Sequence, residues 1–249
     1  MKLTKLVLFS LMAALPSMAN ASDIQDPFYM PQANHVLSGT SFAFSRAKMD
    51  IGTQLKPETK ALSEYLTYGI TDSLFAVASI ANYLNDPKSD FYGKYETTLW
   101  NAGLSYKMSL DQNTSIRFGA AYTEEREEGE DRYNTVKASV LLEPMKDLDL
   151  KPFAAVVYNR NVEYFSKSYD GYDFQAGAWT KLNKASIIAS LDYKYNHHYT
   201  QSETFINLEA NYGLADNIAA GAGFSSMIHE HNTRYSSIIT YGVHVKLTF

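Results

Sequence analysis

The chain ends on Tyr241-Gly242-Val243-His244-Val245-Lys246-Leu247-Thr248-Phe249, and these last nine residues indicate its fold class. Counting back from Phe249, every second residue is apolar, and the residues between them are polar or glycine. This period of two is typical of a β-strand with one apolar face and one aqueous face. A soluble edge strand could alternate in the same way, so the rest of the chain has to separate the two alternatives.

The N-terminus has the features of a secretory signal peptide. Lys2 and Lys5 give it a positive start, residues 6–15 form a short apolar region, and Ala19-Asn20-Ala21 fits the cleavage rule of small residues. The apolar run is too short for a membrane-spanning helix, which needs roughly 18 apolar residues. No cysteine follows it, which excludes lipoprotein processing. We therefore expect a mature chain that begins at Ser22.

The composition of the predicted mature chain limits which classes of protein and partner are possible. Loss of the two lysines leaves 20 basic and 27 acidic side chains, a net charge of −7, which opposes a nucleic-acid partner. The absence of cysteine means that an exported chain needs another stabilising device, and a closed barrel without free edges is one. The chain holds 19 Tyr, 13 Phe and 2 Trp without a second long apolar run. This composition suits a transmembrane barrel, although a soluble β-sandwich remains an alternative on composition alone.

Two features resemble those of known outer-membrane proteins. The terminal strand is similar to the one that their assembly machinery recognises, and its signal residues would be Tyr241, Val243, Val245, Leu247 and Phe249. The pattern Tyr-Gly-x-x-Asp occurs twice, at residues 68–72 and 212–216, each time between two alternating stretches. Together they resemble the broad, porin-like superfamily of small Gram-negative outer-membrane β-barrel proteins, without pointing to a specific member. The resemblance implies location in the outer membrane after cleavage near Ala21, with lipid, lipopolysaccharide and the assembly machinery as partners.

We predict an all-β fold, a transmembrane antiparallel up-and-down barrel with one domain. Residues 1–21 would be the signal peptide, residues 22–36 a periplasmic leader or a segment in the lumen, and residues 37–249 the barrel. Short Asp- and Asn-rich turns alternate with longer polar loops, as expected of such barrels. The twelve expected strands are 38–49, 60–70, 74–84, 96–109, 114–123, 134–144, 150–161, 172–182, 185–196, 204–214, 218–229 and 237–249.

Alternation also predicts which side chains line the lumen. The inward face is polar and small rather than rich in Val, Leu and Ile, so we expect it to be lined by water. Two positions do not fit: residues 150–161 are apolar on both faces, which leaves their register open, and Glu64 falls on the outward face. The candidate lumen residues are Lys107, Arg117, Lys137, Glu143, Asp173, Trp179, Lys181, Asp192, Lys194, Glu209, His244 and Lys246.

Two electrostatic expectations follow from this assignment. Across the turn at Asn183, Asp173 and Lys194 should lie opposite each other and form an inward ion pair. Near the short turns, inward cations should outnumber inward acids and favour anions. The cations of this ring are Lys107, Arg117, Lys181 and Lys246, with Glu143 as the clear acid.

Other motifs have ordinary structural explanations as well as functional ones. The acidic run at residues 124–132 is expected to be a solvated outer loop, and alternatively a divalent-cation site that bridges lipopolysaccharide. His229-Glu230-His231 and His197-His198 could bind a transition metal, but scattered loop histidines are commoner. His198 with Ser202, or His229 with Glu230, are the only local candidates for catalysis. We predict no catalytic site, no metal site and no cofactor.

The sequence favours a porin-like channel for passive diffusion of small hydrophilic solutes. A non-conducting structural or surface barrel, such as an adhesin, is the alternative, and an outer-membrane enzyme comes third. The segment before the first strand bears on this choice, because Phe28 and Tyr29 could anchor it in the lumen. It could equally be a disordered periplasmic leader.

Overall fold

The computed structural model describes residues 24–51, 53–88, 93–111, 114–127, 133–144, 149–163, 169–197, 200–233 and 235–249. The predicted signal peptide, residues 1–21, lies outside these ranges and stays a prediction. Within the described ranges, no helix is long and apolar enough to cross a membrane.

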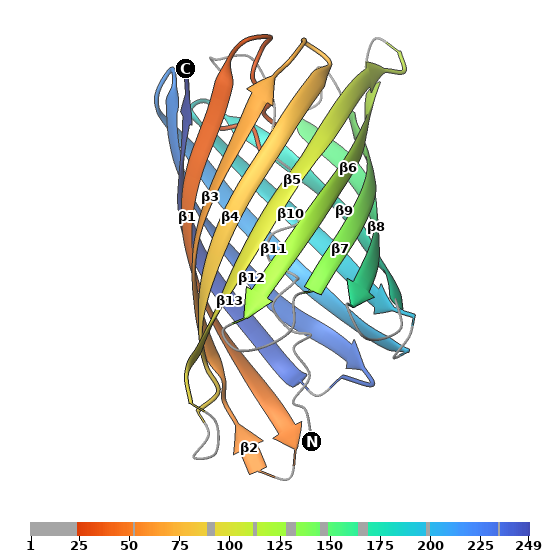
Figure 1. Cartoon of the computed structure of the whole chain (residues 1–249). Helices are drawn as coiled ribbons and strands as arrows, with labels where there is room; N and C mark the ends of the chain where they lie inside the picture. Colours follow the sequence, from red (N-terminus) through yellow and green to blue (C-terminus); the bar gives the residue numbers. More distant parts are fainter. Residues whose placement is uncertain are drawn as a thin grey trace.

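The described chain is built of antiparallel strands that follow one another around a barrel (Figure 1). Their bounds are β1 Val36–Ile51, β2 Thr53–Leu55, β3 Glu58–Gly69, β4 Leu74–Asp86, β5 Tyr95–Ser109, β6 Thr114–Glu127, β7 Tyr133–Pro144, β8 Leu150–Glu163, β9 Tyr169–Leu182, β10 Ala185–Asn196, β11 Gln201–Ala215, β12 Ile218–His231 and β13 Tyr235–Thr248.

The sheet closes on itself, because β13 pairs with β1 from Leu37–Thr248 to Met49–Tyr235. Twelve strands form the barrel wall, and the short β2 only folds back onto the end of β1. This confirms the predicted all-β, up-and-down, twelve-stranded barrel. Several strands run further toward the long loops than expected, as in β6 and β9. Hairpin pairing continues there, where polar residues occupy both faces and alternation no longer marks the strand.

The two ends of the barrel differ. One end, called here the short-turn end, carries the connections β3–β4, β5–β6, β7–β8, β9–β10 and β11–β12, and it is uppermost in Figure 1, where the C-terminus is marked. The backbone groups of Val36 and Phe249 bond each other at this end, with N···O distances of 2.8 and 3.0 Å. The opposite, loop end carries the longer connections.

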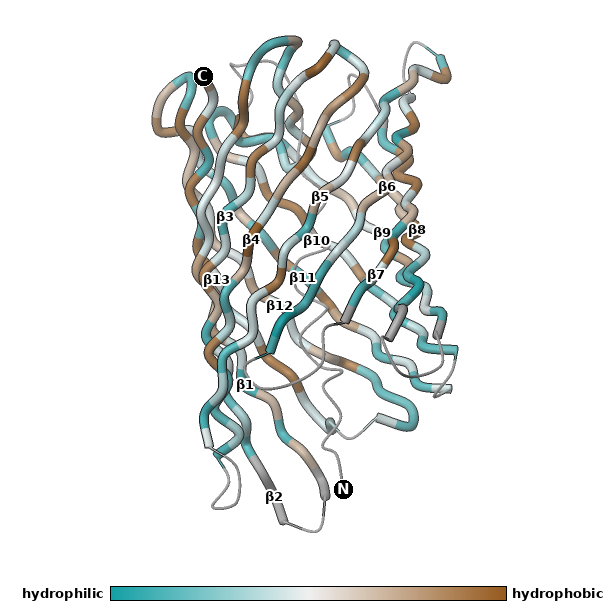
Figure 2. The backbone as a smooth tube through the Cα atoms, in the orientation of Figure 1, coloured by the Kyte–Doolittle hydropathy of each residue, from teal (hydrophilic) through white to brown (hydrophobic). Residues whose placement is uncertain are grey.

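The outer wall is an apolar belt, as the alternation predicts. Leu104, Tyr241 and Val243 are 54%, 55% and 56% exposed, so large apolar side chains face outward in the middle of the strands. Brown apolar positions therefore alternate with paler ones along the strands in Figure 2. Exposed aromatic side chains lie toward both ends of the belt; they are Tyr68, Tyr106, Tyr212 and Phe249 near the short turns, and Trp100, Tyr122 and Tyr172 nearer the loops.

The largest buried apolar cluster lies inside the barrel at the short-turn end. Ile24, Phe28, Tyr29 and Met30 precede β1 and pack against inward side chains of the wall. The wall contributes Leu37, Phe75, Leu141, Phe153, Ala155, Trp179 and Ala219. The register of β8, which the sequence left open, follows from this contact: Phe153, Ala155 and Val157 face inward, and Val156 faces outward.

Candidate functional site in the barrel lumen

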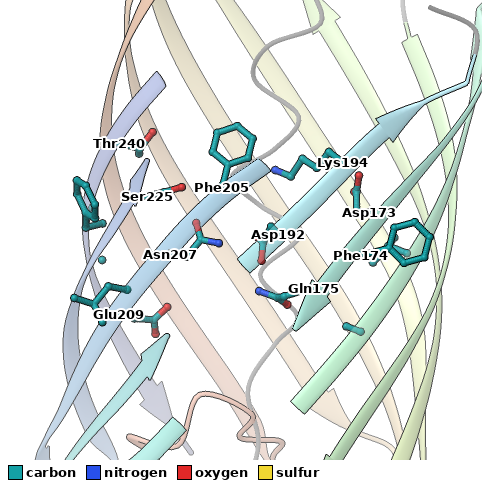
Figure 3. Close-up of a pocket in the computed structure, with 16 residues that line it drawn as sticks. Asp173, Phe174, Gln175, Asp192, Lys194, Phe205, Asn207, Glu209, Ser225 and Thr240 are labelled. Atoms are coloured by element: carbon teal, nitrogen blue, oxygen red, sulfur yellow. The ribbon is translucent and has the colours of Figure 1, made fainter. Parts of the chain in front are cut away.

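The lumen holds a cavity of about 220 Å³ between strands β8 and β13. Its lining is supplied by alternate residues of neighbouring strands, because inward positions recur every second residue. In Figure 3 the labelled side chains that point into the lumen are Asp173, Gln175, Asp192, Lys194, Phe205, Asn207, Glu209, Ser225 and Thr240. The cavity therefore offers carboxylates, an ammonium, amides and hydroxyls to whatever enters it.

One hydrogen-bond network fixes the polar groups of β9, β10 and β11 around Ser190. The Nδ2 of Asn207 and the Nε2 of Gln175 each donate to Ser190 Oγ at 3.2 Å. That hydroxyl donates in turn to Asp192 Oδ1 at 3.1 Å. Because the donors come from the strands on either side, the Asp192 carboxylate is held at a defined place in the wall.

Lys194 and Asp173 lie opposite each other across the sheet, and the ion pair predicted between them stays a prediction. They are direct partners in the β9–β10 register, and both line the cavity. Lys194 Nζ lies 4.7 Å from the centre of the Phe205 ring, an attractive cation–π geometry. Asp173 Oδ2 accepts a hydrogen bond of 2.9 Å from Asn159 Nδ2. On the other side, Lys194 is opposite Glu203 of β11.

Two of the four cations in the predicted ring near the short turns pair with Glu143. Glu143 Oε1 lies 2.9 Å from Lys107 Nζ, and Glu143 Oε2 lies 3.2 Å from Arg117 Nη2. Ser115 Oγ also donates to Glu143 Oε1 at 2.9 Å. The side chains of Arg117 and Glu143 are only 2% and 5% exposed, so little water screens this pair. One carboxylate thus offsets half of the charge of these two cations, and the anion preference of the ring stays a prediction.

A second polar group lies where β11 meets β13. His244 Nε2 is 2.6 Å from Asn211 Oδ1 and 3.8 Å from Glu209 Oε1. Asn211 Nδ2 donates to Glu209 Oε1 at 2.8 Å. Because the amide oxygen can only accept, His244 must donate from Nε2. Lys246, two residues further on the same face, is 6% exposed.

Of the remaining predicted lumen residues, some are buried on the inward face of the barrel, and one is exposed at its rim. Trp179 is buried, and Lys151 Nζ lies 4.4 Å above its ring, a contact that alternation alone could not reveal. Lys137 is partly buried on the inward face of β7. Lys181 has the inward parity, since it pairs with buried Ser186, but it lies at the rim and is exposed.

Residues 24–31 pack against the inner wall of the lumen at the short-turn end. The Phe28 ring meets the Phe153 ring edge-on, with centroids 4.8 Å apart, and Ser186 Oγ donates to the Gln25 carbonyl. Behind the segment, Ala33 N donates to Asp72 Oδ1 at 3.1 Å. Phe28 and Tyr29 are 6% and 2% exposed, so both side chains are packed inside the barrel.

The two Tyr-Gly-x-x-Asp units of the sequence meet this segment. A Cβ on Gly69 would lie 2.1 Å from the carbonyl oxygen of Gln32, and one on Gly213 would lie 3.2 Å from Gln25 Oε1. Asn34 N also donates to the Gly69 carbonyl at 2.7 Å. The glycine of each unit therefore leaves room for the segment inside the wall, most clearly at Gly69.

Asp26 places a titratable group at this end of the lumen. Burial raises the pKa of its carboxyl to about 7, and nearby Glu143 acts in the same direction. The Phe28 backbone N–H, 2.8 Å from Asp26 Oδ1, and the cations Lys151 and Lys246 act against that shift of the pKa. The segment therefore carries a carboxyl whose charge changes close to neutral pH.

The loop motifs are only partly described. His198 and residues 128–132 of the acidic run lie outside the described residues; within that run, Arg126 Nε lies 2.7 Å from Glu124 Oε1. Among the residues that the structure does describe, no group of three or more His, Asp or Glu side chains could hold a metal ion. The metal, divalent-cation and catalytic alternatives at these loops stay untested predictions.

Comparison with known proteins identifies the fold. No protein-family model matches the sequence, and no curated protein matches it. Among solved structures, an outer membrane channel from Pseudomonas putida F1 is similar over 87% of this chain and 96% of its own, with a TM-score of 0.66 and 10% identity. The NanC porin is similar over 84% and 98%, with a TM-score of 0.59 and 10% identity. The translocator domain of the autotransporter NalP from Neisseria meningitidis is similar over 88% and 90%, with a TM-score of 0.58 and 10% identity.

These likenesses extend over nearly the whole of each barrel at very low sequence identity. They confirm the closed antiparallel barrel fold that the resemblance implied, and they point to no specific member. At 10% identity these likenesses show the fold of this chain, and they do not identify its solute or its site residues.

Proposed function

We propose that this protein is an outer-membrane channel that lets small hydrophilic solutes diffuse passively across the membrane. The observation that carries the proposal is the polar cavity of about 220 Å³ inside the barrel. A barrel that served only as a scaffold could fill its interior with Val, Leu and Ile, as dry barrel cores do. The apolar outer belt supports insertion into the outer membrane.

The proposed path runs from the loop end through the cavity to the short-turn end, where residues 24–31 lie across it. Conduction therefore requires this segment to leave its place among Phe153, Trp179 and Leu141. The wall behind it is charged and polar on β6, β7 and β13, with Arg117, Glu143 and Lys246 facing inward. Withdrawal of the segment would expose these groups to water and to passing ions.

One observation favours a second function, a non-conducting surface barrel. The apolar side chains of residues 24–31 are packed inside the short-turn end, as a permanently closed scaffold would also require. The two functions differ in whether the segment can be displaced without unfolding the barrel.

Ion conductance in planar bilayers tests the proposal. The full mature chain and a variant that lacks residues 24–31 would be purified, inserted and recorded under identical salt. A change in gel migration between unheated and heated samples is the check of folding. We expect discrete conductance steps in both proteins, with a larger conductance or open time in the deletion variant. Folded barrels of both kinds that carry no current would contradict the channel and favour the surface barrel.

A further inference from the structure

The lumen cavity already holds an ammonium group, which is that of Lys194. Lys194 Nζ lies 4.7 Å from the centre of the Phe205 ring, and Figure 3 shows the side chain reaching from β10 toward that ring. In the sheet register Lys194 is opposite Asp173 of β9 and Glu203 of β11, so an acidic residue lies on either side of it. An aromatic face flanked by carboxylates is an environment that attracts an ammonium group.

The acids that line this cavity outnumber its cations. Among the described residues of the lining, Lys194 is the single cation, and the acids are Asp173, Asp192 and Glu209. Lys137 of β7 and Glu203 are also near enough to act on the Lys194 charge, and their opposite charges offset each other. The lining therefore keeps a formal charge of −2, which attracts cationic solutes and repels anionic ones.

Most of the polar atoms that the lining offers to a solute are hydrogen-bond acceptors. Gln175 Nε2 and Asn207 Nδ2 both donate to Ser190 Oγ at 3.2 Å, so each amide turns its donor end to that hydroxyl. The amide oxygen of Asn207 points the other way in Figure 3. Carboxylates accept hydrogen bonds and do not donate them. The cavity is therefore suited to a solute that carries donors and positive charge.

Asp192 is the acid that we expect such a solute to meet. It is on the same inward face of β10 as Lys194, two residues away, and it accepts the hydrogen bond of 3.1 Å from Ser190 Oγ. Glu209, by contrast, has His244 as a neighbour, with 3.8 Å between Oε1 and Nε2. The Asp192 carboxylate thus combines a fixed position with proximity to the ammonium group already present.

We propose that this cavity is a binding subsite for small organic cations that carry a primary ammonium group. The solute's ammonium group binds beside Asp192 and competes there with Lys194, which acts as a tethered ammonium. This competition keeps binding weak, as passage through a channel requires. The cavity of about 220 Å³ is smaller than the roughly 300–1,000 Å³ of sites for drug-sized ligands, so the solute has few non-hydrogen atoms. The inference deepens the proposed function and rests on it for the route by which a solute reaches the cavity.

Calorimetric titration of the purified, folded mature barrel tests the subsite without the need for a current. The probe is 1,4-diaminobutane, and the comparison solutes are 1,4-butanediol and succinate, which share its four-carbon chain but carry hydroxyl or carboxylate groups. We expect saturable binding of the diamine and none of the diol or the dianion. Equal binding of either comparison solute, or no binding of the diamine, would overturn the proposal.

Substitutions of opposite charge should change the affinity for the diamine in opposite directions. Asp192→Asn should weaken binding about tenfold, as expected for the loss of one charge-assisted hydrogen bond. Its matched control is Glu64→Gln, which removes a carboxylate from the outer wall, where Glu64 is exposed, as alternation indicated.

Lys194→Gln removes the tethered ammonium and should strengthen binding of the diamine several-fold. Lys184→Gln, in the exposed β9–β10 turn, is its matched control and should not change the affinity. A difference in gel migration between unheated and heated samples shows that each variant is folded. Affinities in the Asp192→Asn and Lys194→Gln proteins that equal those of their controls would overturn the assignment.

Bilayer recordings of the same proteins separate the subsite from the channel. The diamine should block the current of the parent protein reversibly and should block the Asp192→Asn protein less. Folded barrels that bind the diamine but carry no current would contradict the channel and support the subsite. Barrels that conduct but do not bind the diamine would overturn the subsite and leave the channel in place.

Discussion

Replacing Phe28 by alanine is expected to loosen residues 24–31 without changing the barrel wall. The Phe28 side chain is 6% exposed and stacks edge-on against Phe153 at 4.8 Å. Truncating a buried phenylalanine to alanine typically costs about 3–5 kcal/mol, and the low end suits a site that borders a wet lumen. At tenfold per roughly 1.4 kcal/mol, a loss of about 3 kcal/mol raises the fraction of undocked segment about 100-fold.

A single cysteine reports that fraction. Met30 is 6% exposed and the chain has no other cysteine, so Met30→Cys gives one thiol that reacts only when the segment leaves the lumen. The rate of modification by a water-soluble maleimide would be measured in the parent protein and with Phe28→Ala. We expect the rate to rise by about two orders of magnitude, in proportion to the undocked fraction.

Phe118→Ala is the matched control, because it removes the same ring from the outer wall, where Phe118 is 42% exposed. It should leave the modification rate of Met30→Cys unchanged. Equal rates in the Phe28→Ala and Phe118→Ala proteins would refute the docking of residues 24–31 by this contact.

Three further predictions concern charge and assembly. Burial raises the pKa of the Asp26 carboxyl to about 7, from 3.8 for the free side chain. Docking of residues 24–31 should therefore weaken as the pH rises from about 4 to 7, by at most tenfold per pH unit, and stay constant at higher pH. Asp26→Asn should remove this pH dependence from the rates of maleimide modification. Glu143→Gln removes one negative charge beside Lys107 and Arg117, so the reversal potential in a salt gradient should shift toward anions, and an unchanged value would show that these groups lie outside the path. Deleting Phe249 removes the exposed end of the terminal apolar ladder, so the amount of folded barrel in the outer membrane should fall, and undiminished levels of the heat-modifiable form would contradict its role in assembly.

The barrel itself could be predicted because alternation carries the same information on nearly every strand. Once Phe249 and Tyr241 are set outward, neighbouring strands follow, and a shift of one residue would reverse every side chain. Alternation did not determine the register of β8, because Phe153, Ala155 and Val157 are apolar and yet face inward. Their partners are residues 24–31, far away in the sequence, and a periodicity within one strand holds no trace of such a contact.

Alternation predicts which strand positions point inward, but it does not predict the contacts that the side chains make there. Alternation placed Lys107, Arg117 and Glu143 on the inward face, but it could not show that one carboxylate reaches both cations. That contact depends on side-chain reach across two strand pairs, which parity does not specify. The repeated Tyr-Gly-x-x-Asp unit did carry a signal, since Gly69 makes room for Gln32, but only the structure shows what the glycine accommodates.

Single-channel recording of the folded, full mature protein tests the central claim most directly. A polar lumen closed by a displaceable segment predicts discrete current steps that switch between low and high levels, with the low level lost when residues 24–31 are deleted. Barrels shown to be folded and inserted that remain silent, both intact and without residues 24–31, would contradict the claim that this lumen is a path for solutes.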